Sequence, residues 1–254
     1  MKFDELDRRM RLFETASDQF AVPGIYMVAR LDGRSFTRLT REVHRFEAPF
    51  DVRFRDLMVS TTGHLMQCGF RIVFGYSQSD EISLLFDRDE DSFGRKLRKY
   101  LSILAGEASA KFSSDLGAPA SFDCRISQLP SPEYVCDYFR WRAEDAHRNS
   151  LNSHCYWTLR KRGYSAEDAT AFLHGKSVSE KNELLFMAGI NYNELPAWQK
   201  RGTGLYWETY RREEKDRLTN QPVSASRRRL KVDYELPAKD RYSEFLLALM
   251  ADAA

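Results

Sequence analysis

The sequence has few cysteines, and their spacing excludes the usual cysteine frameworks. Cys68, Cys124, Cys136 and Cys155 are its only cysteines, and no two of them form a C-x-x-C pair. A zinc site of closely spaced cysteines and a secreted disulfide scaffold are therefore not expected. We predict four reduced thiols, packed in the core or lying at the surface.

Long apolar runs are also absent. No stretch of about 18 apolar residues, the length that a membrane-spanning helix needs, occurs in the sequence. The first residues, MKFDELDRRMRLFE, carry acidic side chains where a signal peptide needs an apolar segment. We therefore expect a cytoplasmic protein that does not bind a membrane.

An excess of charge of either sign is missing as well. Lys and Arg number 39 against 37 Asp and Glu, so the net charge of +2 says little about partners. With only 13 Gly and 8 Pro in 254 residues, the chain is not of a fibrous or disordered type. The local basic clusters are a stretch over 140–162 and the group Arg227, Arg228, Arg229 and Lys231. Each cluster is either a solvated charged face or a surface that binds phosphates.

Hydrophobic periodicity divides the chain into helices and strands. Apolar residues recur at helical spacing between Phe3 and Phe13 and predict an amphipathic helix over 3–20. The β-branched run over 25–31 predicts a buried strand, and the alternation over 71–86 predicts a β-hairpin with one buried face. The other expected elements are helices over 49–68, 94–115, 130–162, 166–174 and 179–188, and strands over 121–128, 202–210 and 227–234.

The order of these elements is typical of an α+β fold in which helices cover a largely antiparallel sheet. No internal repeat, low-complexity tract or flexible linker is visible. We therefore predict that residues 1–254 form a single catalytic domain with a helical C-terminal elaboration.

Three carboxylates fall at the ends of predicted strands. Asp32 follows the strand over 25–31, and Asp80 and Glu81 lie at the turn of the hairpin. If that strand lies beside the hairpin in one sheet, these side chains meet at one edge, where hard oxygen ligands suit Mg²⁺. Two such ions about 3.5–4 Å apart activate an attacking hydroxyl and stabilise a leaving pyrophosphate. By spacing alone, an ordinary turn at Asp32-Gly33 and a hairpin cap at Asp80 are the more common explanations of these residues.

Five segments in order carry a family resemblance. They are RLDGRSF at 30–36, YSQSDEIS at 76–83, KNELLF at 181–186, NYNELP at 191–196 and RGT at 201–203. With these segments, residues 3–210 resemble the tRNA(His) guanylyltransferase family and its guanylyltransferase-like relatives. The resemblance implies a fold similar to the palm of conventional polymerases.

The resemblance also implies a set of site residues. Two Mg²⁺ ions would be held by Asp32, Asp80 and the backbone of Gly33, and Glu81 would support the catalytic site. Catalysis is thus assigned to Asp32, Asp80 and Glu81. The implied nucleotide-binding residues are Gly33, Arg34, Ser35, Phe36, Ser79, Lys181 and Asn182.

The implied reaction is nucleotide addition to the 5′ end of tRNA in the 3′-to-5′ direction. The 3′-hydroxyl of an incoming nucleotide attacks a 5′-triphosphate, or a 5′-adenylate made from ATP, and releases pyrophosphate or AMP. ATP and GTP or other nucleoside triphosphates are the expected substrates, and tRNA is the expected partner. The family resemblance further implies a homotetramer.

Two segments depart from the family pattern. The family's His-x-Asn-Asn-Leu-Tyr-Asn segment is replaced here by HRNSLNS at 147–153, as in the bacterial guanylyltransferase-like branch. We therefore predict templated repair of truncated 5′ ends, with addition of G at position −1 of tRNA(His) as the alternative. Ala48 stands where many relatives have a lysine, so activation of monophosphorylated RNA would be weaker or would rely on another cation such as Arg45.

Several residues are expected to contact tRNA: His147, Asn149, Asn152, Arg227, Arg228 and Arg229. For His147, a structural hydrogen-bonding role and a role in the motif remain equally open. The aromatic residues Trp141, Tyr156 and Trp157 fit an apolar helix face, which predicts core packing, with base stacking as the alternative.

Other function classes remain as alternatives. A nucleotide cyclase or a conventional 5′-to-3′ polymerase would use the same metal carboxylates, but the segments at 181–186 and 191–196 argue against both. A non-catalytic RNA-binding protein on a degenerate palm is disfavoured because Asp32 and Asp80 are both present.

Overall fold

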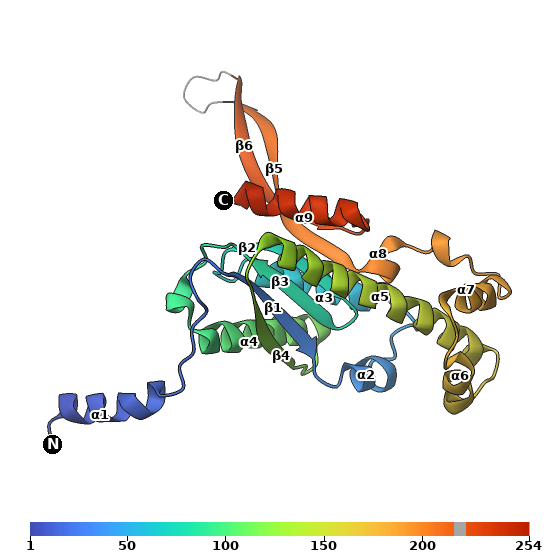
Figure 1. Ribbon diagram of the computed structural model, residues 1–254, viewed down its shortest axis with the longest axis horizontal. Coiled ribbons are helices and arrows are strands. Elements are labelled where there is room, and N and C mark those ends of the chain that lie inside the picture. Colours follow the sequence, from blue (N-terminus) through green and yellow to red (C-terminus); the bar gives the residue numbers. More distant parts are fainter. Residues whose placement is uncertain (216–221, 254) are drawn as a thin grey trace.

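The computed structural model describes residues 1–215 and 222–253. These residues form a six-stranded sheet with helices packed against it (Figure 1). The strand order is β4-β1-β3-β2-β5-β6, and every neighbouring pair is antiparallel. The predicted α+β class with a largely antiparallel sheet is therefore confirmed. The strands are β1 Tyr26–Gly33, β2 Ile72–Gln78, β3 Glu81–Phe86, β4 Phe122–Leu129, β5 Thr203–Lys215 and β6 Pro222–Asp233.

Helices cover both faces of the sheet. On one face, α3 (Val52–Leu65) and α4 (Leu97–Leu116) pack against β1 and β3 around side chains such as Leu31. On the other face, α5 (Pro132–Lys161) and α9 (Asp240–Ala253) pack over β2, as Figure 1 shows. The predicted hairpin is confirmed as β2 and β3, but the prediction of a single buried face is wrong, because helices cover both faces and β2 is buried from Ile72 to Ser77.

The long helix α5 continues beyond the sheet and carries a small helical group. This group comprises α6 (Ala166–Leu173) and α7 (Val178–Phe186), which pack on the far half of α5 around Leu151 and Leu185. A 3₁₀ turn (Tyr192–Glu194) and α8 (Ala197–Arg201) lead from it back to the sheet.

Some element boundaries differ from the sequence predictions. The first helix, α1 (Phe3–Thr15), ends earlier than expected, and α3 begins at Val52 instead of Pro49 because Asp51 caps it by accepting from Arg53 N at 2.7 Å. Periodicity also missed α9 and two short turns, α2 (Phe36–Arg38) and the π-helix Leu39–Val43.

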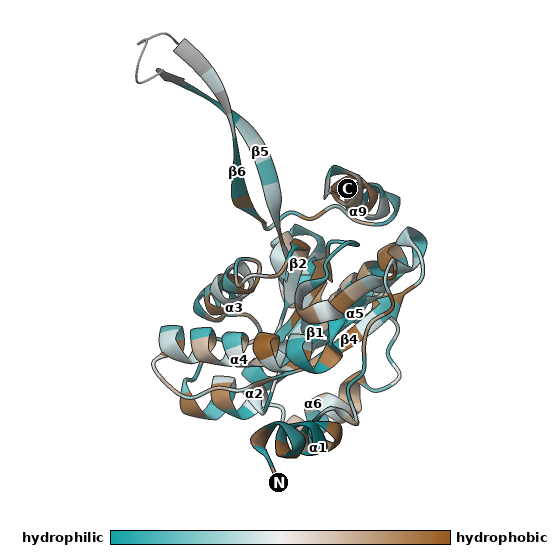
Figure 2. Ribbon diagram, turned by 90° about the vertical axis from the view of Figure 1, so that its left-hand side faces the viewer, coloured by the Kyte–Doolittle hydropathy of each residue, from teal (hydrophilic) through white to brown (hydrophobic). Residues whose placement is uncertain are grey.

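The C-terminal part is not purely helical, contrary to the predicted helical elaboration. The strand composition expected over 202–210 and 227–234 is confirmed, but the strands are longer and pair along their length. Figure 2 shows this β5–β6 hairpin extending from the body as a largely hydrophilic arm. Every residue of β5 from Gly204 to Lys215 pairs with a residue of β6, so the hairpin is continuous along this length.

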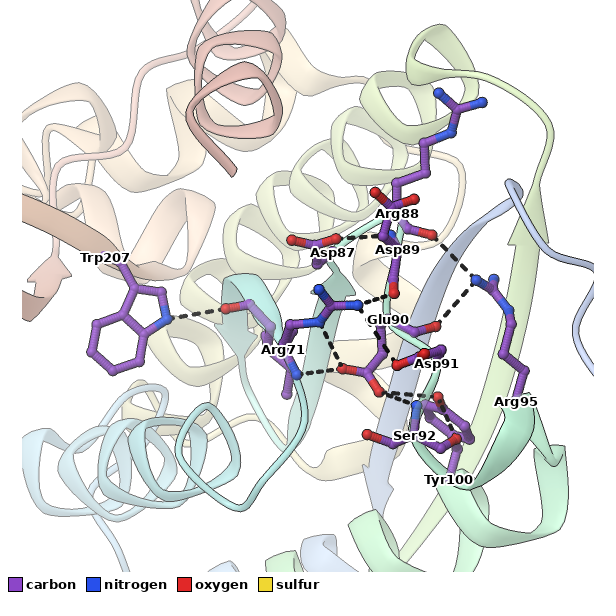
Figure 3. A network of polar contacts seen from close by, with 11 residues as sticks. Arg71, Asp87, Arg88, Asp89, Glu90, Asp91, Ser92, Arg95, Tyr100 and Trp207 are labelled. Carbon is purple, nitrogen blue, oxygen red and sulfur yellow. Dashed lines mark hydrogen bonds and ion pairs between the residues drawn. The ribbon is translucent and has the colours of Figure 1, made fainter. Parts of the chain in front are cut away.

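A polar network fixes the loop after β3, at the end of the strand remote from Glu81 (Figure 3). Glu90 is only 1% exposed and accepts from Arg71 N at 2.6 Å, Ser92 N at 2.8 Å and the Tyr100 hydroxyl at 3.2 Å. Arg95 donates to Arg88, Glu90 and Ile25 carbonyls, which ties the loop to the start of β1. The buried Glu90 carboxylate and the terminal nitrogens of Arg95 thus gain hydrogen-bond partners.

The four cysteines are free thiols, as predicted. Cys136 and Cys155 are buried, and Cys68 and Cys124 are half-buried. Across residues 1–215 and 222–253, no helix is long and apolar enough to cross a membrane.

Candidate active site

Strand pairing brings the three predicted carboxylates together at one edge of the sheet. In the register of β1 with β3, Asp32 lies opposite Glu81, and the Gly33 amide donates to the Asp80 carbonyl at 3.0 Å. The predicted convergence of Asp32, Asp80 and Glu81 is therefore confirmed, and all three side chains line one cavity.

The turn of the hairpin holds Asp80 in an unfavourable electrostatic setting. Ser79 adopts left-handed backbone geometry (φ 52°), and its hydroxyl donates to Asp80 Oδ1 at 2.9 Å. Burial raises the pKa of Asp80 against this hydrogen bond, and the charge of Asp32 raises it further. The site therefore brings negative charges close together before any ligand is bound.

Glu81 differs from its neighbours because it has a cationic partner. The Arg142 guanidinium, 6% exposed, contacts the Glu81 carboxylate and lies 3.3 Å from Asp145 Oδ2. Burial raises the pKa of Glu81, and the charge of Arg142 opposes this effect. Glu81 is thereby held by the protein itself, which leaves Asp32 and Asp80 as the carboxylates available to a ligand.

The donor set fits a hard divalent cation. No Lys, Arg or His of the described residues forms an ion pair with Asp32 or Asp80, so no cation among these residues compensates their repulsion by direct pairing. Carboxylate and carbonyl oxygens with open positions are the ligands that Mg²⁺ prefers. The described residues hold no cluster of three or more His, Cys, Asp and Glu side chains placed to bind a metal. The set that fits is therefore two carboxylates, from Asp32 and Asp80, with a main-chain oxygen.

The structure gives a different reason for glycine at position 33 than close approach to an ion. A Cβ on Gly33 would lie 2.5 Å from the ring of Phe36. Phe36 is 2% exposed and packs against the rings of Phe54, Phe112 and Phe122, all within 6.2 Å. Gly33 is thus required by the packing of Phe36, whose ring also forms part of the cavity wall.

The other two nucleotide-binding residues implied within the first motif lie at the surface. Arg34 and Ser35 are exposed and outside the cavity lining, with Ser35 in left-handed geometry (φ 61°). Ser79, from the hairpin motif, lines the cavity beside Asp80.

The carboxylates form one wall of a cavity of about 420 Å³, which we call the carboxylate cavity. Among the residues that line it, Arg41, Arg55, Phe46, Phe50, Trp157 and Trp198 were not identified as site residues from the sequence. The Arg55 guanidinium lies over the rings of Trp198 at 4.8 Å and Tyr234 at 4.6 Å, and Arg41 lies over Trp157 at 5.4 Å. The cavity therefore combines acidic, aromatic and cationic surfaces, as a nucleotide requires.

The helix α5 contributes the opposite wall. Asn149, Ser150 and Ser153 line the cavity, whereas Asn152 is exposed and does not. His147 also lies outside the lining. Its ring packs edge-on against Tyr192 at 5.4 Å, and burial lowers its pKa.

Lys181 and Asn182, implied by the resemblance to bind nucleotide, do not line the carboxylate cavity. Both lie on α7, where the Asn182 amide donates to the Val178 carbonyl at 2.9 Å. The Lys181 carbonyl accepts from the Cys155 thiol at 3.4 Å, which ties α7 to α5. Arg45 is exposed and outside the lining too, so Arg41, Arg55 and Arg142 are the cations at the cavity.

The basic cluster at 227–229 lies on β6, away from the cavity lining. Arg228 lies over the ring of Trp207 at 5.5 Å, and Arg229 pairs with Glu208 at 2.6 Å. All three arginines are exposed on the hairpin arm.

The core packing predicted for the α5 aromatics holds only in part. Trp141 is 51% exposed, with the Arg142 guanidinium 4.7 Å from its ring, so that prediction is wrong for Trp141. Trp157 is half-buried and forms part of the cavity wall, while Tyr156 packs against the small helical group.

Two family models match the chain. The model described as tRNAHis guanylyltransferase matches residues 7–130, and the model described as Thg1 C terminal domain matches residues 133–241. A probable tRNA(His) guanylyltransferase of Drosophila melanogaster is 34% identical over 73% of this chain and 68% of its own length. The tRNA(His) guanylyltransferase of Debaryomyces hansenii is 33% identical over 86% of this chain and 87% of its own.

Solved structures share the fold. A bacterial tRNA(His) guanylyltransferase (Thg1)-like protein in complex with GTP matches with a TM-score of 0.73 and 28% identity, over 97% of this chain and 99% of its own. A bacterial Thg1-like protein in complex with ATP matches with a TM-score of 0.74 and 27% identity, over 96% of this chain and 99% of its own. The tRNA(His) guanylyltransferase of Saccharomyces cerevisiae gives 0.72 and 26%, over 78% and 91%. The expected palm-like fold is thereby confirmed.

Proposed function

The chain belongs to the tRNA(His) guanylyltransferase family, and from this premise we propose that it adds guanylate to the 5′ end of tRNA(His). The names of the curated relatives support this choice, which was the alternative in the sequence analysis, over templated repair. The observation that carries the proposal is that Asp32 and Asp80 lie together at the wall of a cavity lined with aromatic and cationic side chains.

Templated repair of truncated 5′ ends is the second candidate. It is favoured by Ser150 and Ser153, which line the carboxylate cavity where the family segment has asparagines. A hydroxyl reaches less far than an amide and offers one donor where the amide offers two, so recognition of the substrate differs at this wall. The bacterial Thg1-like protein, similar over nearly the whole chain, is consistent with this candidate.

Each wall of the cavity has a part in the proposed reaction. Asp32, Asp80 and a main-chain oxygen at Gly33 would hold Mg²⁺, which when bound supplies charge neutralisation at the phosphates and activation of the 3′-hydroxyl. Arg142 holds Glu81 in place, and Arg41 and Arg55 supply positive charge opposite the carboxylates. Transfer then depends on holding the hydroxyl in line with the 5′-phosphoryl group.

The proposed substrates are GTP and, for activation of a monophosphorylated 5′ end, ATP. The complexes of the bacterial Thg1-like protein with GTP and with ATP support this assignment. Because Ala48 supplies no charge, Arg41 and Arg55 are better placed than Arg45 to meet the phosphates.

The residues that contact the tRNA are also part of the proposal. Asn149 meets the cavity directly, while His147 and Asn152 lie beside it on α5 and Arg227, Arg228 and Arg229 lie on the arm. Lys181 and Asn182 would act on a part of the RNA or triphosphate outside the carboxylate cavity. We also propose a homotetramer, since α1 exposes Phe3 and Phe13 and buries none of its side chains within this chain.

The two candidates are separated by the substrate that is lengthened. The purified protein would be incubated with Mg²⁺, nucleoside triphosphates and 5′-triphosphorylated tRNAs, either intact tRNA(His) or tRNAs lacking their first nucleotide. One guanosine added to intact tRNA(His) alone supports the guanylyltransferase function. Addition only to truncated tRNAs, matching the opposite acceptor strand, replaces it by repair, and no addition to either tRNA refutes both.

A further inference from the structure

A second cavity, of about 270 Å³, adjoins the carboxylate cavity and shares Pro49 and Trp157 with it. Its other walls come from the last turns of α5, which carry His154 and Lys161, from Arg162 directly after this helix, and from the segment after α7. None of the site residues predicted from the motifs lines this second cavity. Its chemistry therefore requires a separate explanation.

His154 gives the second cavity an unsatisfied polar atom. The side chain belongs to a residue that is only 8% exposed, and its ring lies 5.3 Å from Phe50 and 6.0 Å from Tyr192. Its Nε2 meets no hydrogen-bond criterion among residues 1–215 and 222–253, although the Gln199 side chain faces the ring. Buried polar atoms without a good partner are rare in folded proteins. Rotation of the ring toward the cavity would let a polar group of a bound ligand satisfy this atom.

The rest of the second cavity offers an aromatic surface and positive charge. Trp157 is half-buried in the wall common to both cavities, and an indole face can stack on a nucleobase. Lys161 and Arg162 are exposed at the end of α5, and Lys161 forms no ion pair with a described residue. Arg162 donates one N–H to the Met187 carbonyl at 3.5 Å and keeps its other donors. Stacking surface, hydrogen-bonding group and cations together match one nucleotide.

We propose that the second cavity binds a single nucleotide of the RNA substrate, with its base against Trp157 and His154 and its phosphate beside Lys161 and Arg162. RNA is favoured over a free nucleotide because the shared wall places this nucleotide next to the one in the carboxylate cavity. One continuous strand can then occupy both, as single-stranded ends do when aromatic side chains separate their bases. The choice of RNA as ligand rests on the proposed function, but the cavity's chemistry does not.

The test measures RNA binding apart from activity. Affinity for fluorescently labelled tRNA would be measured over a range of salt concentrations, without nucleoside triphosphates, for the wild type and for Lys161→Ala, Arg162→Ala and His154→Leu. Lys99→Ala is the matched control, because Lys99 lies on α4, outside both cavities, with its ammonium 5.6 Å from the centre of the Phe93 ring. The KM for GTP and the thermal midpoint would be measured on the same variants.

The proposal predicts weaker tRNA binding by several-fold for each of the three variants, with an unchanged KM for GTP. For the lysine and arginine variants, the salt dependence should fall by about 0.7–0.9 in log–log slope, as for one lost phosphate contact. His154→Leu should keep the wild-type thermal midpoint or exceed it, since an unpaired buried atom is removed. If that variant fails to fold, Lys161→Ala and Arg162→Ala still test the proposal.

Unchanged tRNA affinity in the cavity variants would overturn the proposal, as would a wild type that binds no tRNA. A raised KM for GTP with unchanged tRNA affinity would also overturn it, because the cavity would then take a free nucleotide. Variants that weaken tRNA binding in a protein that lengthens no tRNA would support the second cavity and refute the proposed function. The two ideas therefore fail separately.

Discussion

At the scale of single residues, two aspartates of one cavity have opposite electrostatic roles. Asp80 is buried beside Asp32, and its pKa is raised by burial and by that neighbouring charge. Asp51 accepts from Arg53 and from the Glu47 and Arg53 amides, and the hydrogen bond from Arg53 lowers its pKa to about 2 despite burial. The ionised form of Asp51 thus stabilises the folded state, whereas the ionised form of Asp80 destabilises it.

We predict opposite effects of the two isosteric amides on the metal-free protein. At pH 7, Asp51→Asn should lower the free energy of unfolding by about 1 kcal/mol, because the cap of α3 loses its charge. Asp80→Asn should leave that free energy unchanged or raise it. Because the pKa of Asp51 is depressed, its contribution is present above the unfolded value of about 3.9 and is lost as the pH falls toward 2. Urea unfolding with and without EDTA measures both effects, and destabilisation by Asp80→Asn would contradict this account.

His154 predicts a second pH dependence. Burial lowers its pKa to about 4, whereas an unfolded histidine titrates near 6.5. Below about pH 6.5 the unfolded chain binds a proton that the folded protein excludes, so stability falls as the pH drops toward 4. At pH 5 this loss should be on the order of 1–2 kcal/mol and should be missing from His154→Leu. Equal pH dependence of urea unfolding in both proteins would exclude this role.

At the scale of elements, the loop after β3 depends on the carboxylate of Glu90. The hydrogen bonds from Ser92, Arg71 and Tyr100 lower its pKa, although burial raises it. We predict that Glu90→Gln lowers the free energy of unfolding by about 1–3 kcal/mol, since an amide nitrogen would then face a donor. Asp89→Asn, an exposed neighbour, is the control. Nucleotide addition at the remote end of β3 should persist at temperatures where the variant is folded, and a wild-type thermal midpoint would contradict the prediction.

The elements that the sequence predicted well are those in which one local pattern decides the structure. β1, β3 and α5 were placed because apolar periodicity and Pro132 mark them directly. The double-sided burial of β2 was missed because it depends on α9, which follows in the chain about 160 residues later and had no assignment.

The prediction of the site was likewise limited to residues that a local pattern marks. Asp32, Asp80 and Glu81 stand at strand ends, so an antiparallel pairing brings them together. Arg55, Trp198 and Tyr234 meet from three distant segments, and no local signal marks a cation stacked between two aromatic rings. Family motifs named Lys181, but its helix turns out to pack on α5 beyond the cavity lining.

At the scale of the whole molecule, the two halves of the chain complete one site. Strand β5, from the second matched region, pairs with β2 of the first and continues the sheet. The carboxylates come from the first half, and Arg142, Ser150 and Trp198 come from the second. The helix α1 and the β5–β6 arm extend from this body, as Figure 1 shows.

The central claim is that Asp32 and Asp80 carry out nucleotide addition to the 5′ end of tRNA. It is tested most directly by single-turnover lengthening of 5′-triphosphorylated tRNA(His) with GTP and Mg²⁺, comparing Asp32→Asn and Asp80→Asn with Asp123→Asn. Asp123 pairs with Asp32 across β1 and β4 but is exposed and outside the cavity. Since losing even an outer partner of a metal ligand costs 10–100-fold, we predict a loss of at least about 100-fold for the two cavity variants and wild-type rates for the control. Equal rates in all proteins would contradict the account.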